Sequence, residues 1–382
     1  MEHYTDFIVL VIFCTAAAVP FYSYFLFPVI LRLVARFNAK NFRCSGDDLP
    51  SVTLLISAYN EDSVIEEKIE NCLSLDYPQE KLQVFILNDG STDGTDEIVE
   101  RYRVKGIKHY RVEGRGGKNV AINEGWPMVE GDIVIFSDAN SMYQKDAIRR
   151  LVSPFLDERI GCVCGELRYI CMDTGSSLGE NMYWKYEQYL KKLQSRMGEV
   201  LVLNGSIFAI RRELFRPLEP KIANDFSLPL AVSLRGYSLI YEPEAVAIEK
   251  ATKSAQEEFS RKTRIIARGY EGFFHHFREF RGLRLFQFIS QKFLRWNVWL
   301  AMVVMFFSNS LLLQHPFFLW LFAAQLVFYT MACAGPILNR TNIPLIVIPY
   351  YFCMVNLGAA VGLWRFVFRK QKATWKSPAS SR

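Results

Sequence analysis

Long apolar segments at both ends most constrain the fold of this 382-residue chain. Near the N-terminus, residues 7–37 read FIVLVIFCTAAAVPFYSYFLFPVILRLVARF. An apolar run of about 20 residues or more is long enough to cross a bilayer as a helix. Acidic residues precede this run and basic residues follow it, which is unlike the basic leader of a cleaved signal peptide. The sequence therefore predicts a retained membrane helix over residues 1–36, with its amino end outside and its carboxyl end in the cytosol.

Three further apolar segments predict about three membrane helices within residues 296–366. Their predicted bounds are Trp296–Leu313, Pro316–Gly335 and Ile343–Trp364. Four crossings would return the C-terminus to the outer side, whereas the basic tail over residues 367–382 favours the cytosol. One of these segments could instead lie in the interface or re-enter the membrane. Residues 273–295 mix arginines with Phe and Leu, which predicts an amphipathic helix on the membrane surface.

Residues 37–272 have a different pattern, which predicts a cytosolic domain. Short β-rich runs alternate with helical spacing: strands are predicted at 51–59, 82–89, 106–112 and 132–138, and helices at 61–75, 95–103 and 117–129. Such alternation predicts an α/β fold with a mostly parallel sheet and helices on both faces. Beyond residue 138 the order of strands and helices becomes mixed.

Polar or acidic side chains stand where three of these strands end. They are Ala58, Tyr59, Asn60 and Glu61 after the first strand, Asp89 after the second and Asp138 after the fourth. In parallel sheets, ligands bind beyond the carboxyl ends of the strands. Taken alone, Asp138 could be a helix cap and Asp89 part of an Asp-Gly turn. Their arrival at one edge predicts a shared binding site, in which Asp89 accepts hydrogen bonds from a base or a ribose.

A glycine-rich segment, EGRGGKNVAIN, precedes the third helix. Its backbone N–H groups, with Arg115 and Lys118, could bind phosphate oxygens. It lacks the spacing of a Walker loop and of the dinucleotide fingerprint, so a solvated basic loop remains the alternative.

The formal charge of +6 does not indicate a nucleic-acid binder. Both charge signs are interleaved, and the basic clusters lie beside apolar runs, as at a membrane surface. The eight cysteines are scattered and predict free thiols rather than a zinc site.

The order of these motifs resembles that of the membrane-bound family 2 glycosyltransferases with a GT-A fold, which include cellulose, chitin and hyaluronan synthases and many exopolysaccharide enzymes. The resemblance covers about Pro50 to Arg268. It implies that the first strand end and Asp89 hold the nucleotide. It also implies that Asp138-Ala139-Asn140, in place of Asp-x-Asp, binds Mg²⁺ or Mn²⁺ through Asp138 and Asn140. The catalytic base would be Asp225 of the pair Asn224-Asp225, although a helix cap is the alternative for Asp225.

One motif of the processive members of this family is incomplete here. Aligned on the arginine of Gln-x-x-Arg-Trp, the chain reads Glu258-Phe259-Ser260-Arg261-Lys262, so both the glutamine and the tryptophan are missing. Arg261 and Lys262, with Arg264, could still donate to a leaving diphosphate. The alternative is a basic helix that faces the membrane. The incomplete motif argues against long processive synthesis, whereas the C-terminal membrane helices favour extrusion of a polymer.

The resemblance implies an inverting, metal-dependent glycosyltransferase at the inner membrane, with its catalytic domain in the cytosol. The donor would be a nucleotide-diphospho-sugar, with UDP as the expected nucleotide. The acceptor would be a growing polysaccharide or a lipid-linked molecule, and other polysaccharide-biosynthesis proteins are possible partners. The alternative is a catalytically silent membrane scaffold or nucleotide-sugar sensor, since Asn140 and Asn224 weaken two acidic motifs and fold alone does not guarantee activity.

Overall fold

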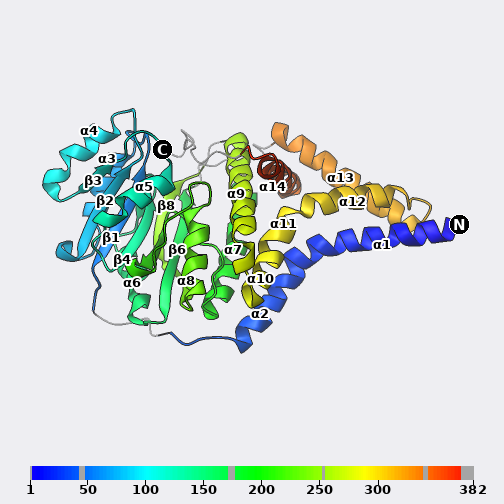
Figure 1. Ribbon diagram of the computed structural model, residues 1–382. Coiled ribbons are helices and arrows are strands. Elements are labelled where there is room, and N and C mark those ends of the chain that lie inside the picture. The colour runs from blue at the N-terminus through cyan, green and yellow to red at the C-terminus, as the bar shows by residue number, and fades with distance from the viewer. Residues whose placement is uncertain (1, 43–47, 171–176, 252–253, 339–342, 371–382) are drawn as a thin grey trace.

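The computed structural model describes residues 2–42, 48–170, 177–251, 254–338 and 343–370. Within these residues, the centre is an eight-stranded sheet in the order β3-β2-β1-β4-β7-β6-β8-β5 (Figure 1). The strands are β1 Val52–Ala58, β2 Leu82–Asn88, β3 Lys108–Arg111, β4 Ile133–Asp138, β5 Met142–Tyr143, β6 Ile160–Ile170, β7 Phe208–Arg211 and β8 Ser238–Lys250. β1 pairs in parallel with β2 and β4, and β2 with β3, whereas β7 is antiparallel to both β4 and β6. The predicted α/β fold class is therefore confirmed.

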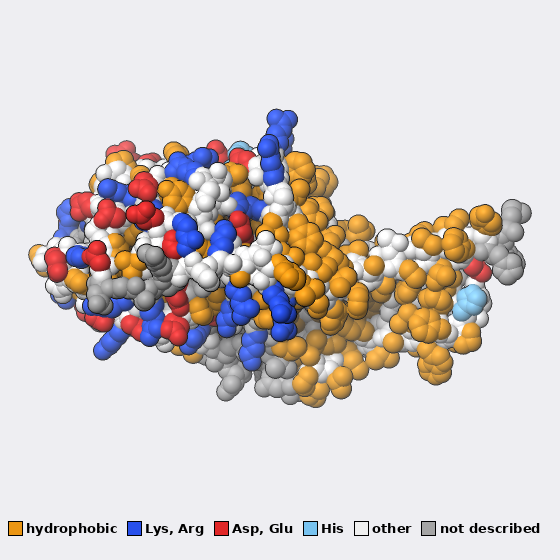
Figure 2. Space-filling model, turned by 90° about the horizontal axis from the view of Figure 1, so that it is seen from below, with side chains coloured by type: hydrophobic (Ala, Val, Ile, Leu, Met, Phe, Trp, Pro, Cys, Tyr) orange, Lys and Arg blue, Asp and Glu red, His pale blue; other side chains and the backbone are white. Residues whose placement is uncertain are grey.

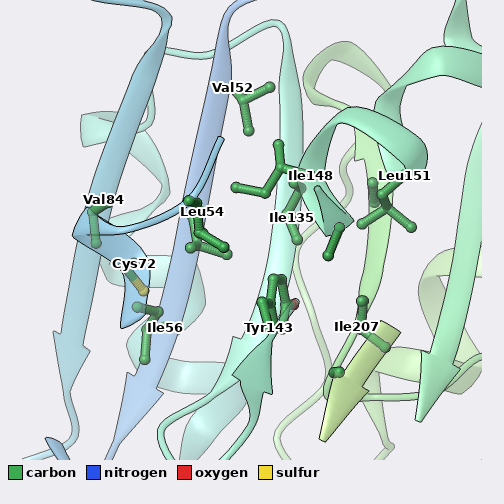
Figure 3. Packing of buried hydrophobic residues seen from close by; sticks show 14 of the residues in the cluster. Val52, Leu54, Ile56, Cys72, Val84, Ile135, Tyr143, Ile148, Leu151 and Ile207 are labelled. Atoms are coloured by element: carbon green, nitrogen blue, oxygen red, sulfur yellow. The ribbon is translucent and has the colours of Figure 1, made fainter. Parts of the chain in front are cut away.

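Helices cover both faces of this sheet. They are α3 Ile65–Leu73, α4 Thr95–Arg101, α5 Lys118–Gly125, α6 Ala147–Val152, α7 Ser177–Arg196 and α8 Asn224–Leu234, whereas α9 Ala255–His275 packs against α8 and α14 Pro344–Val367. Successive side chains of a strand point to opposite faces. Leu54 and Ile56 of β1 accordingly pack in one buried cluster with α3 and α6 (Figure 3), whereas Leu55 packs in another cluster with α5 and α8. These two apolar layers fix the sheet, and with it the edge at which the polar strand ends meet.

The first apolar segment forms an almost continuous helix from α1 Glu2–Phe21 through a π-turn to α2 Phe27–Phe37. At 1.5 Å per residue, its apolar part over Tyr4–Phe37 is about 51 Å long, more than the roughly 30 Å of a bilayer core. The excess is explained by α2, since its buried Phe27, Leu31 and Ala35 pack against α7 of the sheet domain.

Among the residues that the structure describes, three helices are long and apolar enough to cross a membrane: Tyr4–Phe37, Pro316–Pro336 and Pro344–Val367. They contain α1 with α2, α13 Pro316–Leu338 and α14 Pro344–Val367. The span predicted at Trp296–Leu313 is instead a shorter apolar helix, α12 Val298–Ser310. α12 lies beside α1, and Gln314 Nε2, just after it, donates to Asp6 Oδ1 at 3.2 Å.

The apolar helices differ in how they are covered. α1, α12 and α13 project together from the sheet domain (Figure 1), and hydrophobic side chains cover this projection (Figure 2). Charged side chains gather on the sheet domain in the same view. α14 instead packs along α9, where Gly358 and Gly362 leave room for Thr263 and Ile266.

The single amphipathic helix predicted over residues 273–295 does not form. The segment contains the end of α9, a 3₁₀ turn at Phe277–Glu279, α10 Gly282–Phe288, a π-turn at Ile289–Phe293 and the start of α11 Leu294–Trp296. Gly282 has a φ of +53°, which interrupts regular helix before α10. Phe280 and Phe288 are buried against Phe226 and Phe273, so the segment joins the apolar helices to the sheet domain.

Candidate active site

A cavity of about 700 Å³ lies at the carboxyl ends of β1, β2 and β4 and extends to α9, α11 and α14. Its lining contains most of the residues that the sequence singled out: Ala58, Tyr59, Glu61, Asp89, Lys118, Asp138, Asn140, Asp225, Arg261, Lys262 and Arg264. The parallel strands β1, β2 and β4 bring their end residues to one edge, as predicted, whereas Lys118, Asp225 and the α9 cations come from helices. Their roles in binding or catalysis remain predictions at this point.

Asn60 occupies a different place from the one predicted. It has a φ of +53°, and its backbone N–H donates to Ser91 Oγ at 2.9 Å. Its Oδ1 accepts from the backbone N–H of Thr92 at 2.8 Å. Asn60 therefore ties the loop after β1 to the loop after β2, outside the lining of the cavity.

The glycine-rich segment holds Asp89. The backbone N–H groups of Gly116 and Gly117 donate to Asp89 Oδ1 at 2.9 and 2.8 Å. Gly90 has a φ of +68°, and a Cβ atom there would lie 1.9 Å from Gly114 O, so only glycine lets the two loops meet. Burial raises the pKa of Asp89, and the two N–H donors oppose that rise. The glycine-rich loop therefore positions the Asp89 carboxylate. Neither interpretation of its sequence, a phosphate-binding loop or a solvated basic loop, had included this role.

Asp138 stands at the tip of β4 with a cation on one side. Lys118 Nζ lies 2.5 Å from Asp138 Oδ1, and Ser206 Oγ donates to Oδ2 at 3.2 Å. Behind it, Ser141 donates to Glu249 of β8, and the fully buried Lys68 donates to the carbonyl of Ser141. Burial lowers the pKa of Lys68, while Asp138 and Glu249 are among the anions that oppose this.

The oxygen donors at this tip suit a divalent cation that is completed by a substrate. Within the part of the chain that the structure describes, no group of three His, Cys, Asp or Glu side chains could hold a metal by itself. Mg²⁺ usually takes one or two carboxylates and completes its shell with phosphates and waters. Asp138 and Asn140, both in the cavity lining, offer one carboxylate and one amide oxygen. These residues fit a cation that binds together with a diphosphate.

Asp225 reaches the same cavity from the first turn of α8. Burial raises its pKa, Lys118 is the largest opposing influence, and Asp138 adds to the rise. A Cβ atom at Gly205 would lie 3.1 Å from Asp225 Oδ2, so the glycine lets that loop pass close to the carboxylate. Asn224 Nδ2 is buried and has no hydrogen-bond partner among the described residues.

One family model matches part of the sheet domain. Residues 53–218 match the family model for Glycosyl transferase family 2. This part of the chain is therefore similar to the family 2 glycosyltransferases. This match includes Asp89 and Asp138 and ends before Asp225 and α9.

Two curated relatives are similar to this chain over a longer stretch than the family model. The chain is 26% identical over 242 residues to the probable glycosyltransferase YdaM of Bacillus subtilis, covering 59% of this chain and 57% of the relative. It is 29% identical over 211 residues to the poly-beta-1,6-N-acetyl-D-glucosamine synthase of Staphylococcus aureus, covering 52% and 50%. The chain spans about half the length of the curated relatives it matches.

A solved structure matches almost the whole chain. The mannosyltransferase PcManGT of Pyrobaculum calidifontis, in complex with GDP-Man and Mn²⁺, superposes with a TM-score of 0.71 at 23% identity. The match covers 94% of this chain and 99% of the other. At this identity the likeness establishes the fold, apolar helices included.

Helix α9 brings cations to the cavity. Arg261 Nε donates to Glu258 Oε2 at 2.7 Å and its Nη1 to Tyr169 Oη at 2.6 Å, while Lys262 Nζ lies 3.4 Å from Glu258 Oε1. Burial, together with the like charges of Arg268 and Arg261, lowers the pKa of Arg264 to about 9. Arg261, Arg264 and Arg268 all line the cavity, so this face of α9 is turned to the site rather than to lipid.

Several residues that line the cavity or lie behind it had no clear signal in the sequence. Glu249 alternates with apolar residues on β8 as any half-buried strand residue does, and Lys68 resembles a surface lysine of an amphipathic helix. Glu187, Lys292 and Arg295 form a buried ion cluster in which Lys292 Nζ lies 3.0 Å and Arg295 Nη1 2.5 Å from Glu187. Spacing along the chain could not have paired them, because α7 and α11 are about a hundred residues apart.

Proposed function

We propose that this protein is an inverting, divalent-metal-dependent glycosyltransferase that moves a sugar from a nucleotide-diphospho-sugar to a polysaccharide or lipid-linked acceptor at a membrane. One observation carries the proposal: Asp138 with its Lys118, and Asp225, come from separate elements and line the same cavity, next to helices apolar enough to span a membrane. The match of residues 53–218 to the family 2 model and the complex of the similar PcManGT with GDP-Man and Mn²⁺ support it.

Two groups of residues would act on opposite sides of the transferred sugar. Tyr59 and Asp89 would hold the nucleoside, and Asp138 with Asn140 would hold Mg²⁺ or Mn²⁺ against the diphosphate. When bound, the cation neutralises charge that develops on the leaving diphosphate. Lys118, Arg261 and Lys262, with Arg264, would donate to the same phosphate oxygens.

Asp225 would accept the proton of the attacking hydroxyl. The new bond forms between that oxygen and the anomeric carbon as the bond to the diphosphate breaks, and attack from the opposite face inverts the anomeric centre. The raised pKa of Asp225 makes its carboxylate a stronger proton acceptor than an ordinary aspartate.

The domain arrangement is part of the proposal. The sheet domain would lie in the cytosol, with the first apolar helix entering from outside, α12 and α13 on the same side of the domain as that helix, and α14 along α9. UDP is the nucleotide we expect for the donor. The basic tail predicted to favour the cytosol lies outside the described residues beyond Lys370.

The direct test is nucleotide release by the purified full chain from a panel of UDP- and GDP-sugars, with Mg²⁺ or Mn²⁺ present. We expect turnover with at least one donor, a loss on adding EDTA and recovery on returning the metal. Asp138→Ala should lower the rate by about 10²-fold or more, since several kcal/mol of charge stabilisation are removed. The matched control is Asp146→Ala, a surface aspartate paired with Arg150.

The same experiment separates an enzyme from a silent scaffold or sensor. A scaffold would bind a nucleotide sugar and release no nucleotide under any condition. An unchanged rate in Asp138→Ala would show that the role assigned to this carboxylate is wrong.

A further inference from the structure

A fully buried lysine lies behind the tip of β4, and the proposed transfer reaction does not use it. Lys68 belongs to α3, its exposure is 0%, and it is not part of the cavity lining, so its ammonium group does not reach a ligand there. Burying an ammonium group is costly unless anions and hydrogen bonds compensate it. The contacts of Lys68 therefore indicate which part of the protein it holds in place.

The ammonium group of Lys68 is directed to the turn that joins β4 to β5. Its Nζ donates to the carbonyl oxygen of Ser141 and lies 4.1 Å from the centre of the Tyr143 ring. The same turn begins at Asp138 and contains Asn140, the two residues to which we assign the divalent cation. Lys68 therefore contacts the cation-binding turn from the side opposite to the cavity.

Glu249 of β8 holds the same turn through a second bond. Its Oε1 accepts from the hydroxyl group of Ser141, so Lys68 and Glu249 bind the carbonyl and the hydroxyl group of one fully buried residue. Asp138 and Glu249 are both among the anions that compensate the charge of Lys68. These two carboxylates also repel each other. Removal of Lys68 would leave them with one cation fewer and the turn with one bond fewer.

Helix α3 also fixes the far end of the turn. Asn71 follows Lys68 by three residues, so both side chains lie on one face of the helix. Asn71 Nδ2 donates to Tyr143 O at 2.9 Å, and Asn71 Oδ1 accepts from the Tyr143 N–H at 2.8 Å. Tyr143 Oη donates to Ser206 O at 2.9 Å, and Ser206 Oγ donates to Asp138 Oδ2 at 3.2 Å. These bonds connect α3 to the Asp138 carboxylate through two routes.

Building on the proposed function, we propose that Lys68 is a positioning residue for the cation site: with Glu249, it holds the turn from Asp138 to Ser141 in the shape that binds Mg²⁺ or Mn²⁺ with a nucleoside diphosphate. Lys68 itself supplies no ligand to the cation. Groups behind the ligands of a metal orient those ligands, and their loss typically weakens metal binding about 10–100-fold. Because Asp138 is the one carboxylate that we assign to the cation, its orientation decides how well the turn binds a metal.

Nucleotide binding to the purified full chain tests this role without a sugar donor. The affinities for UDP and for GDP are measured by isothermal titration calorimetry, once with saturating Mn²⁺ and once in EDTA. We expect Lys68→Met to weaken binding about 10–100-fold with Mn²⁺ and at most about twofold in EDTA, because the turn contacts the nucleotide through the cation. A purely structural role for Lys68 would weaken binding equally under both conditions.

A second variant and a control accompany Lys68→Met. Ser141→Ala removes the bond to Glu249 and keeps the carbonyl that Lys68 binds, so it replaces Lys68→Met if that variant fails to fold in a thermal unfolding assay. It should weaken Mn²⁺-dependent binding about tenfold, since a hydrogen bond to a charged group is lost. Lys105→Met, which breaks an exposed pair with Glu70, should change neither affinity. Unchanged binding with Mn²⁺ in the folded variant, or equal weakening with Mn²⁺ and in EDTA, would overturn the proposal.

Nucleotide release separates the role of Lys68 from the proposed function. Turnover and Mn²⁺-dependent binding that are lost in Asp138→Ala and kept in folded Lys68→Met would support the enzyme and contradict the role of Lys68. Mn²⁺-dependent binding that is lost in Lys68→Met, in a protein that turns over no donor, would support the role of Lys68 and contradict the enzyme. Nucleotide binding to the wild type that Mn²⁺ does not tighten would contradict the metal dependence and, with it, the role of Lys68.

Discussion

The two halves of the cavity are built in different ways. At the strand ends, Glu61, Asp89 and Asp138 follow three parallel strands that are paired side by side. At the membrane side, Glu187, Lys292 and Arg295 come from helices that meet only through tertiary packing. The first half presents carboxylates with a cation beside them, and the second presents cations that exceed their carboxylate.

This difference suggests a division of labour within one site. Carboxylates suit a metal and a hydroxyl proton, whereas buried ions that pair across helices destabilise the fold when one partner is lost. Each half therefore predicts a different consequence when it is altered: loss of chemistry at the strand ends, and loss of stability at the helices.

The largest expected effect is on chemistry. Asp225→Asn should lower the transfer rate by about 10²–10⁴-fold, because a general base is removed while the shape is kept. Initial rates of nucleotide release with donor and acceptor measure it, with Asp146→Asn as the control. A rate within a few-fold of the wild type would assign Asp225 to helix capping instead.

The next effect tests the membrane-side half through stability. Glu187→Gln should destabilise the fold by about 3–5 kcal/mol, because it leaves Lys292 and Arg295 buried without their anion. Glu244→Gln breaks an exposed pair with Arg150 and should cost at most about 1 kcal/mol. Denaturant unfolding in detergent measures the free energy of unfolding of both variants. Equal losses of stability would show that the buried cluster contributes no more than an exposed ion pair.

A smaller effect concerns the loop that holds Asp89. Gly90→Ala should cost more than Gly106→Ala, although both glycines have positive φ, because only Gly90 would place its Cβ against a carbonyl oxygen. Left-handed backbone alone costs about 1–2 kcal/mol, so the excess in Gly90→Ala measures the contact between the loops. Weaker nucleotide binding in Gly90→Ala, and not in Gly106→Ala, would tie that contact to Asp89.

The smallest effect is on pH dependence. Burial raises the folded-state pKa of Asp225, so transfer should fall on the acid side at a pH above the usual aspartate range. For the same reason, ionised Asp225 lowers stability at neutral pH, and this cost vanishes below the unfolded-state pKa. Asp225→Asn should therefore melt higher than the wild type at neutral pH and show no such gain in acid. A gain that persists in acid would point to a cause other than ionisation.

The sequence predicted the strand-end half closely. Predicted strands at 51–59, 82–89, 106–112 and 132–138 form as β1 to β4 with ends within about two residues. The ends of β1, β2 and β4 meet at one cavity. Asn60 shows the limit of prediction from the sequence. The turn after β1 directs its side chain to the loop after β2 and not into the cavity, and strand spacing does not predict the conformation of that turn.

The sequence by itself determined the strands, the apolar helices and the acidic strand tips. The strands and helices follow from the spacing of apolar residues and the length of apolar runs, which are local properties. The meeting of the strand tips follows from the general rule that parallel strands end at the same edge of a sheet. Only the tertiary structure decided that residues 273–295 break into short helices, that the glycine-rich loop holds Asp89, and that Arg295 meets Glu187. These contacts join residues far apart in the chain, and the free energy of a charge depends on what lies within a few ångströms in space, which spacing along the sequence does not record.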